Sequence, residues 1–262
     1  MISLLLILLP LLTGLAAFFI KDEKLARTWA VLASFATLTI AILSLCCMND
    51  TKSLNYHCEW LPSLGASFSL KMDGVAQLLC LLNTIAYPLV FIAGWDKTYK
   101  NAKNFFALML LAQAGIMGVF LAADALLFYF FWELALIPMY FLCSQWGGEK
   151  RVAVTFKFFI YTFIGSLLML ISILYLYGQT PDHSFSIESF YNLKLTSKQQ
   201  SIPFWLMFVA FAVKMPIFPV HTWQPDTYEQ APTSTTMILS GVMVKMGVFG
   251  LIRWLFPIFS TA

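Results

Sequence analysis

Apolar runs of membrane-spanning length recur along the whole chain, and they constrain its fold more than any other feature. A helix needs roughly twenty apolar residues to cross the hydrocarbon core of a bilayer. The runs predict about eight such helices, at residues 2–20, 29–48, 75–95, 104–123, 125–143, 153–177, 203–220 and 233–256. With 60% hydrophobic and only 11% charged residues, the composition excludes a water-soluble domain. We therefore expect an all-α, polytopic transmembrane helical bundle.

Motifs for nucleotides, metals and nucleic acids are missing from the sequence. It has no G-x-G-x-x-G after a strand and no Walker-type loop, so we expect no NAD or ATP site. The cysteines form no C-x-x-C pair and have no His at ligand spacing, which favours inert apolar side chains. They are Cys46, Cys47, Cys58, Cys80 and Cys143. A net charge of +3 without a basic run argues against nucleic-acid binding.

Basic residues in the predicted loops indicate the orientation of the chain. One face collects Lys21, Lys24, Arg27, Lys97, Lys100, Lys103, Lys150 and Arg151, and the other holds Lys52, Lys71, Lys194, Lys198 and Arg253. The first face has its excess in short early loops, which count most for the positive-inside rule. We therefore expect the N-terminus to be extracytoplasmic. The first apolar run precedes its charges, which indicates a retained helix rather than a cleaved signal.

Four charged side chains fall inside the predicted helices: Glu133, Lys157, Lys214 and Lys245. A lysine at the centre of a spanning helix costs at least ~2.5–3.5 kcal/mol on insertion scales, so such residues mark ion pathways. Glu133 is too deep to reach the interface, and it either carries protons or fastens helices by pairing with a lysine. Lys157 lies near the start of its helix, where it either relays protons or extends to the interface.

Prolines break the segment between the two deepest lysines, Lys214 and Lys245. They are Pro216, Pro219, Pro225 and Pro232. Proline removes a backbone donor, and irregular backbone at membrane depth survives only inside protein or beside a watery cavity. A discontinuous seventh helix that carries a titratable group near the midplane is typical of cation transport, here of protons.

Other titratable side chains surround this broken segment. Two unit charges ~4 Å apart interact by ~4 kcal/mol at an effective dielectric of 20. Movement of Glu133 toward or away from Lys214 would therefore make that lysine hold or release a proton. His221 either hands protons between water and Lys214 or caps freed carbonyls. Asp226 and Glu229 are expected to be solvated or capping groups in a proline-rich loop.

Long motifs then point to a known family. The segments FWELALIPMYFL (131–142), TFKFFIYT (155–162) and FAVKMPIFPVHTWQPDTYEQAPTSTTMILSGVMVKMGVFGLIR (211–253) closely resemble the antiporter-like subunit M family of NADH:quinone oxidoreductase, respiratory complex I. The segments LKMDGVAQLL (70–79) and IMGVFLAADALLFYFFWE (116–133) fit the same family.

The resemblance implies a proton-pumping translocase subunit of the membrane arm, driven by electron transfer elsewhere in the complex. By motif, Glu133 is the essential acid paired with Lys214, and Lys245 continues the route. Lys157 matches the lysine of the KFFIYT motif, whose role is less settled. NAD, flavin, iron–sulfur clusters and quinone are expected on other subunits, and no cofactor on this chain. The partners are neighbouring antiporter-like subunits of the membrane arm.

The resemblance also implies a domain division and a location. Residues 1–103 correspond to three N-terminal helices and residues 104–256 to the first antiporter-like repeat, whereas the second, inverted repeat is absent after Ala262. A fragment or a truncated gene is therefore expected. Without a transit peptide, and with motifs close to bacterial ones, the chain is assigned to a bacterial inner membrane rather than a mitochondrial one.

Two other functions stay open beside the complex I assignment. Subunits of multi-subunit Na⁺/H⁺ antiporters and of membrane-bound hydrogenases share the same helices and charged residues. A non-conducting truncated remnant is the third alternative. Sodium-dependent proton flux without a redox substrate would favour the antiporter.

Overall fold

The computed structural model describes residues 1–46 and 51–259, so that Cys47 lies outside the described residues. The helices are α1 (Ile2–Ala17), α2 (Glu23–Cys46), α3 (Thr51–Leu54), α4 (Gly74–Ala93), α5 (Ala102–Leu121), α6 (Ala125–Trp146), α7 (Arg151–Gln179), α8 (Ile187–Tyr191), α9 (Ser197–Lys214), α10 (Trp223–Gln230), α11 (Thr233–Ile238), α12 (Val244–Gly250) and α13 (Phe256–Ile258). A two-stranded hairpin joins β1 (Tyr56–Leu61) to β2 (Ala66–Leu70).

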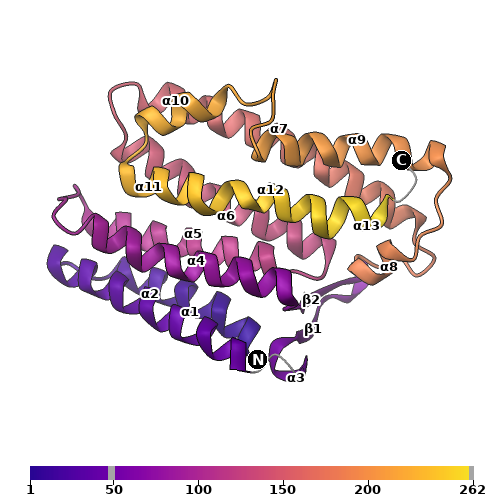
Figure 1. The fold of residues 1–262 in the computed structure, drawn as a ribbon, viewed down its shortest axis with the longest axis horizontal. Helices are drawn as coiled ribbons and strands as arrows, with labels where there is room; N and C mark the ends of the chain where they lie inside the picture. Colours follow the sequence, from indigo (N-terminus) through magenta and orange to yellow (C-terminus); the bar gives the residue numbers. More distant parts are fainter. Residues whose placement is uncertain (47–50, 260–262) are drawn as a thin grey trace.

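Long apolar helices confirm the predicted membrane bundle. Among the described residues, six are long and apolar enough to cross a bilayer: Glu23–Cys46, Gly74–Ala93, Ala102–Leu121, Ala125–Trp146, Arg151–Gln179 and the composite Thr233–Ile258. Helix α1 is shorter, and α9 begins with a polar turn. The helices run roughly along one axis, with the hairpin near the start of α1 and α8 near α13 (Figure 1). The chain is a multi-pass membrane protein.

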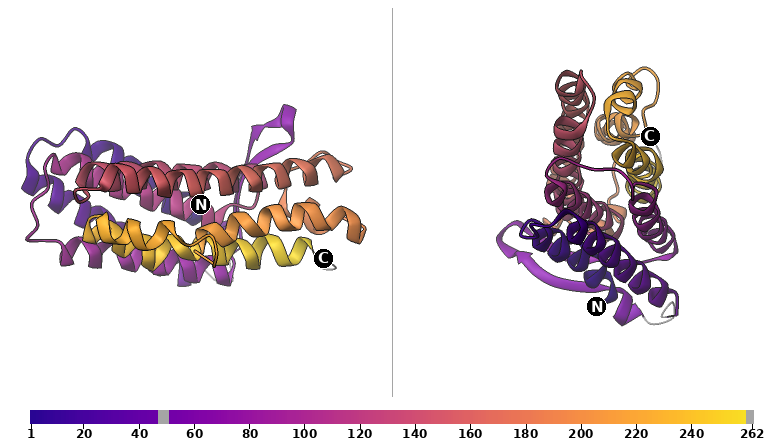
Figure 2. Two further views of the ribbon diagram at one scale, coloured as in Figure 1. Left: turned by 90° about the horizontal axis from the view of Figure 1, so that it is seen from above. Right: turned by 90° about the vertical axis from the view of Figure 1, so that its left-hand side faces the viewer.

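Helix α5 lies at the centre of the bundle, because it contacts α1, α2, α4 and α6. Of its most apolar stretch, 83% is buried, whereas lipid-facing helices such as α2 keep most of theirs exposed. Small residues allow the close approach, since a Cβ on Gly115 would lie 2.8 Å from the backbone of Ala135 on α6. Figure 2 shows α1 and α2 together at one side of the bundle, and α7 beside the last helices at the opposite side.

Backbone hydrogen bonds tie three distant segments together at the hairpin end of the bundle. Ala123 N, in the tight turn between α5 and α6, donates to Ser69 O of β2 at 2.9 Å. On the other side of that turn, Ala125 N donates to Phe185 O at 2.8 Å and Ile187 N donates to Ala123 O at 3.0 Å. The hairpin, the turn and the start of α8 therefore form one small plate, which covers the end of the bundle.

The last membrane helix is not a regular α-helix. Two π-helical turns, Leu239–Met243 and Leu251–Leu255, separate α11, α12 and α13. A π-turn leaves one extra residue in the helix and changes the direction of the side chains that follow it, and such turns are frequent at functional sites. Lys245 follows the first of them by two residues.

Candidate functional site

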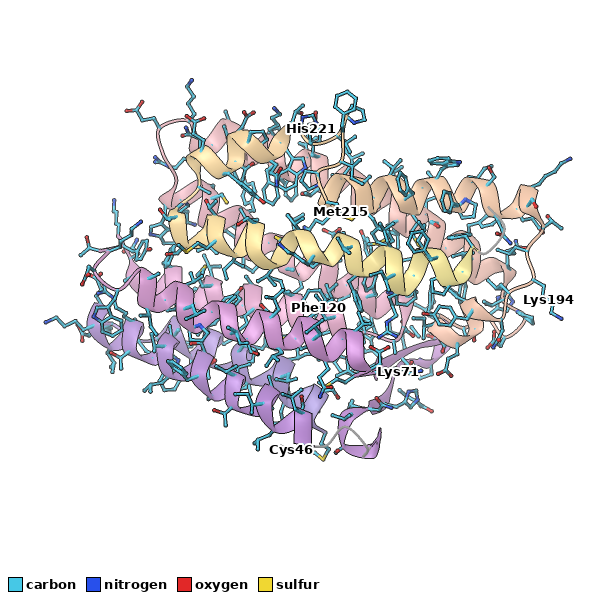
Figure 3. The ribbon with its side chains drawn as sticks, in the orientation of Figure 1. Cys46, Lys71, Phe120, Lys194, Met215 and His221 are labelled. Carbon is cyan, nitrogen blue, oxygen red and sulfur yellow. The ribbon has the colours of Figure 1, made fainter. Side chains whose placement is uncertain are left out.

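The predicted break of the seventh spanning helix lies directly after Lys214. Helix α9 ends at that residue, a turn follows, and α10 begins at Trp223. Figure 3 shows Met215 and His221 on the two sides of this break, near the middle of the bundle's length. Proline at position 216 has no backbone donor and cannot continue the helix. The indole Nε1 of Trp223 donates to Val213 O at 2.9 Å and satisfies a carbonyl that the break leaves free.

The boundaries of this segment correct two predictions. The prediction placed the helix at residues 203–220, whereas α9 spans Ser197–Lys214. The proline-rich loop expected around Asp226 and Glu229 is wrong, because both residues lie in the helix α10. Pro225 fits there because the first turn of a helix has no partner for its backbone N–H groups.

The side chain of Lys214 is enclosed by aromatic and aliphatic groups. It is 2% exposed, and its Nζ has no hydrogen-bond partner within the part of the chain that the structure describes. Nζ lies 5.5 Å from the ring centroid of Trp132 on α6, within cation–π range. The side chain also borders a gap lined by Phe158, Trp223, Leu239, Met243 and Val244. This gap is too narrow for a water molecule.

Glu133 is the acid that the sequence analysis paired with Lys214 by motif. It lies one residue after Trp132 on α6, is half-buried, and has Ser166 of α7 beside its carboxyl group. No ion pair within 4.0 Å joins its carboxylate to the ammonium group of Lys214. Glu133 Oε1 has no hydrogen-bond partner among the described residues. Glu133 and Lys214 therefore form no direct salt bridge in this conformation.

Lys245 lies on α12, immediately beyond the gap beside Lys214. Its Nζ donates to Ser240 O at 2.7 Å, a carbonyl within the π-turn. Helix α12 approaches α9 closely at Gly247, where a Cβ would lie 2.5 Å from Met215 Cγ. Met243 and Val244, which directly precede Lys245 in the chain, line the narrow gap beside Lys214.

Lys157 and His221, the two further candidates, lie on the α10 side of the break. Lys157 Nζ forms an ion pair with Asp226 Oδ2 at 2.7 Å and donates to Thr222 O at 2.9 Å. The His221 ring lies 5.7 Å from that of Phe218, and its Nδ1 has no partner in the described chain. The structure thus places Lys157 with Asp226, whereas among the described residues no hydrogen bond or ion pair joins Lys214 to Glu133 or to Lys245.

Three residues of the site were missed by the sequence analysis: Trp132, Ser166 and Trp223. Trp132 precedes the buried acid, and a polar residue such as Ser166 in an apolar run is a weak signal for a polar neighbour on another helix. Trp223 follows the break, where a donor side chain is needed to satisfy free carbonyls. Among the described residues, no group of three His, Cys, Asp or Glu side chains could hold a metal ion.

Buried charges at a broken membrane helix define a class of protein, namely the polytopic proteins that carry ions along residues inside the bundle. The sequence profile of the family described as "NADH:quinone oxidoreductase/Mrp antiporter, TM" matches residues 122–262. This match covers more than half of the chain, and the chain belongs to that family.

Relatives with curated names support the same placement. The chain is 35% identical over 263 residues to F(420)H(2) dehydrogenase subunit M of Methanosarcina mazei, covering 97% of this chain and 53% of the relative. It is 39% identical over 212 residues to NADH-quinone oxidoreductase subunit M of Escherichia coli K12, covering 78% of this chain and 42% of the relative.

A solved structure matches nearly the whole fold. Respiratory complex I from Thermus thermophilus with bound NADH contains a chain that superposes with a TM-score of 0.87 at 27% identity, covering 99% of this chain and 54% of that one. The chain therefore spans about half the length of the relatives that it matches.

Proposed function

We propose that the chain supplies the first proton-carrying half of a membrane-arm subunit of NADH:quinone oxidoreductase. The observation that carries this proposal is the buried Lys214, which has no hydrogen-bond partner among the described residues and lies at a helix break beside a narrow gap. An enclosed amine without a partner is costly to keep charged, so its protonation depends on the neighbouring charge. The family match and the subunit M relatives support the same assignment.

The geometry supports a three-step route for a proton. Glu133 approaches Lys214 and stabilises its ammonium form, because the two charges attract strongly in a medium of low polarity. When Glu133 withdraws, Lys214 loses that stabilisation and releases its proton toward Lys245. The gap beside Lys214 must admit water for this transfer, since it is too narrow for a water molecule in this conformation. Lys157 and His221 are proposed as relays on the side of α10.

The rest of the assignment is proposed on the same basis. Residues 1–103 would be the N-terminal helices and residues 104–256 the first antiporter-like repeat, with which the matched residues 122–262 largely overlap. Electron transfer would take place on other subunits, which would hold NAD, flavin, iron–sulfur clusters and quinone, while this chain holds no cofactor. We propose a bacterial inner membrane, with the N-terminus extracytoplasmic.

A second candidate is a subunit of an antiporter or of a complex with another electron donor. The Methanosarcina mazei relative favours it, because that relative is named as a subunit of an F(420)H(2) dehydrogenase. The assays that separate the candidates are proton uptake driven by NADH and proton flux driven by a sodium gradient without any redox substrate. Flux of the second kind would replace the complex I assignment.

Substitution of the three carriers tests the proposal. In inverted membrane vesicles, Glu133→Gln and Lys214→Ala should abolish proton uptake during NADH oxidation, and Lys245→Ala should reduce it strongly. Lys198→Ala is the matched control, because Lys198 is exposed on the same helix as Lys214. Assembly is checked from the amount of intact complex in the membrane. Wild-type uptake by the Glu133→Gln complex would contradict the assignment of the site.

A further inference from the structure

Residues of α7 and α10 form a set of polar contacts outside the route through Glu133, Lys214 and Lys245. Lys157 Nζ lies 2.7 Å from Asp226 Oδ2 and 2.9 Å from Thr222 O. One turn along α7, Tyr161 OH lies 2.9 Å from Thr222 Oγ1. We call these four residues, Lys157, Tyr161, Thr222 and Asp226, the α7–α10 clamp. They join the start of α10 to two successive turns of α7.

The same face of α10 closes over Lys214. Trp223 and Asp226 are three residues apart, a spacing that places two side chains on one face of a helix. The Trp223 ring is 2% exposed and lies 5.0 Å from the ring of Phe158, the neighbour of Lys157 on α7. Trp223 also lines the gap beside Lys214 and donates to Val213 O. The polar contacts of the clamp therefore lie beside the Trp223 ring, which covers the gap next to Lys214.

The two ends of α10 are held in different ways. At its last residue, Gly148 N donates to Gln230 O at 2.8 Å, and Lys150 N donates to Gln230 Oε1 at 3.1 Å. Its first residue follows an exposed turn in which Phe218 is 82% exposed. Near the first turn of α10, the clamp and the Trp223 contacts are the polar attachments that join it to α7 and α9. If they open, that turn can move while Gln230 stays in place.

We infer that Lys157 and Asp226 are positioning residues that hold α10 as a lid over Lys214. With the ion pair closed, Trp223 seals the gap and keeps water from the lysine. With the ion pair broken, the first turn of α10 moves away, water enters the gap, and Lys157 becomes free to act as a relay. The role of the lid in proton transfer rests on the proposed function. The opening of the lid is tested separately, by the access of water to the gap.

Water access to the gap can be measured with a thiol placed in its wall. Met243→Cys, introduced into the full membrane complex, places the thiol at a residue that is 1% exposed. Val244→Cys is the second probe, at a half-buried position. A membrane-impermeant maleimide is applied from the side of α10, and labelling of the parent complex without the probe gives the background from the native cysteines. With the clamp intact, the probe should label slowly.

Disruption of the clamp should then accelerate labelling. Asp226→Asn and Lys157→Met should each raise the labelling rate about three- to tenfold, because loss of a partly exposed ion pair and its hydrogen bonds changes an opening equilibrium by that order. The exchange of the two charges, Lys157→Asp with Asp226→Lys, should restore slow labelling. Glu229→Gln is the matched control, because Glu229 is exposed on the same helix and, among the described residues, no hydrogen bond or ion pair joins it to the clamp.

The outcomes separate the lid from the proton route. Unchanged labelling at both probes in Asp226→Asn would overturn the lid, whatever the proton uptake of that variant. Equally fast labelling in Glu229→Gln would also overturn it, because the effect would then be general loosening of α10. Accelerated labelling in the clamp variants alone supports the lid, even if Lys214→Ala retains proton uptake and the proposed function fails.

Discussion

Replacement of Asp124 by Ala should weaken the fold at the point where α6, the helix of Glu133, begins. The side chain is fully buried and accepts hydrogen bonds from two elements, helix α6 and the hairpin. It caps α6 by accepting from Leu126 N at 3.0 Å and from Leu127 N at 3.1 Å. It also accepts from Ser67 N of the hairpin at 2.9 Å. Deletion of the carboxylate therefore removes a helix cap and leaves a hairpin donor without its partner.

The magnitude follows from these two losses. An N-cap is worth about 0.5–2 kcal/mol, and a buried donor without a partner costs about 1–3 kcal/mol. We therefore expect Asp124→Ala to lower the free energy of unfolding by about 2–4 kcal/mol. In a chain of this size, that corresponds to a fall of about 5–15 °C in the unfolding midpoint. Tryptophan fluorescence of the purified complex in lipid nanodiscs, followed during heating, measures the midpoint.

Two control variants make the reasoning refutable. Asp124→Asn keeps an acceptor oxygen at the cap, so it should lose less than half of what the Ala variant loses. Glu59→Ala removes an exposed acid from β1 and should leave the midpoint unchanged within about 0.5 kcal/mol. If Asp124→Ala unfolded at the wild-type midpoint, or if the Asn variant were as unstable as the Ala variant, the proposed double role of this carboxylate would be wrong.

Three further changes test other parts of the structure. Burial alone would raise the pKa of Asp73, but a backbone N–H of α4 and the paired Arg253 lower this pKa below 3.8. The stability of the wild type should therefore fall as the pH drops through that region, because the carboxylate becomes protonated. Asp73→Asn should lack this fall when unfolding midpoints are measured from pH 3 to pH 6. Gly115→Ala should cost about 1–3 kcal/mol by overpacking against α6, whereas Gly178→Ala, with no neighbouring atoms within 4 Å, should not lower the midpoint. Trp132→Leu removes the ring near the buried lysine of α9 and should slow proton uptake about tenfold, by ~1–2 kcal/mol, while Trp132→Phe should slow it less.

The membrane helices and the buried charges could be predicted because each depends on local composition. A run of about twenty apolar residues has few alternatives to a spanning helix, and the lengths of α4 to α7 follow those runs closely. The break after Lys214 was also predictable, since Pro216 cannot continue the helix.

Other features escaped prediction because they depend on contacts between distant residues. The hairpin has short strands, although the turn between them contains Gly65 at a φ of 68°, which a glycine adopts without strain. The ion pair of Lys157 with Asp226 joins residues that lie 69 positions apart. The dry gap beside Lys214 results from four helical segments that meet at one point. No residue spacing in the sequence predicts which helical segments come together there.

The contrast between the two ends of the bundle has a consequence for how the chain tolerates change. At the hairpin end, the small plate is joined through main-chain atoms such as Ala123 N and Ser69 O, whose hydrogen bonds survive most side-chain replacements. At the opposite end, α10 is attached to α7 by the side chains of Lys157, Tyr161 and Asp226. Natural variation should therefore be tolerated at many side chains of the plate, except at Asp124, whose carboxylate also holds the hairpin, while a single exchange at the α10 attachment alters how the molecule moves.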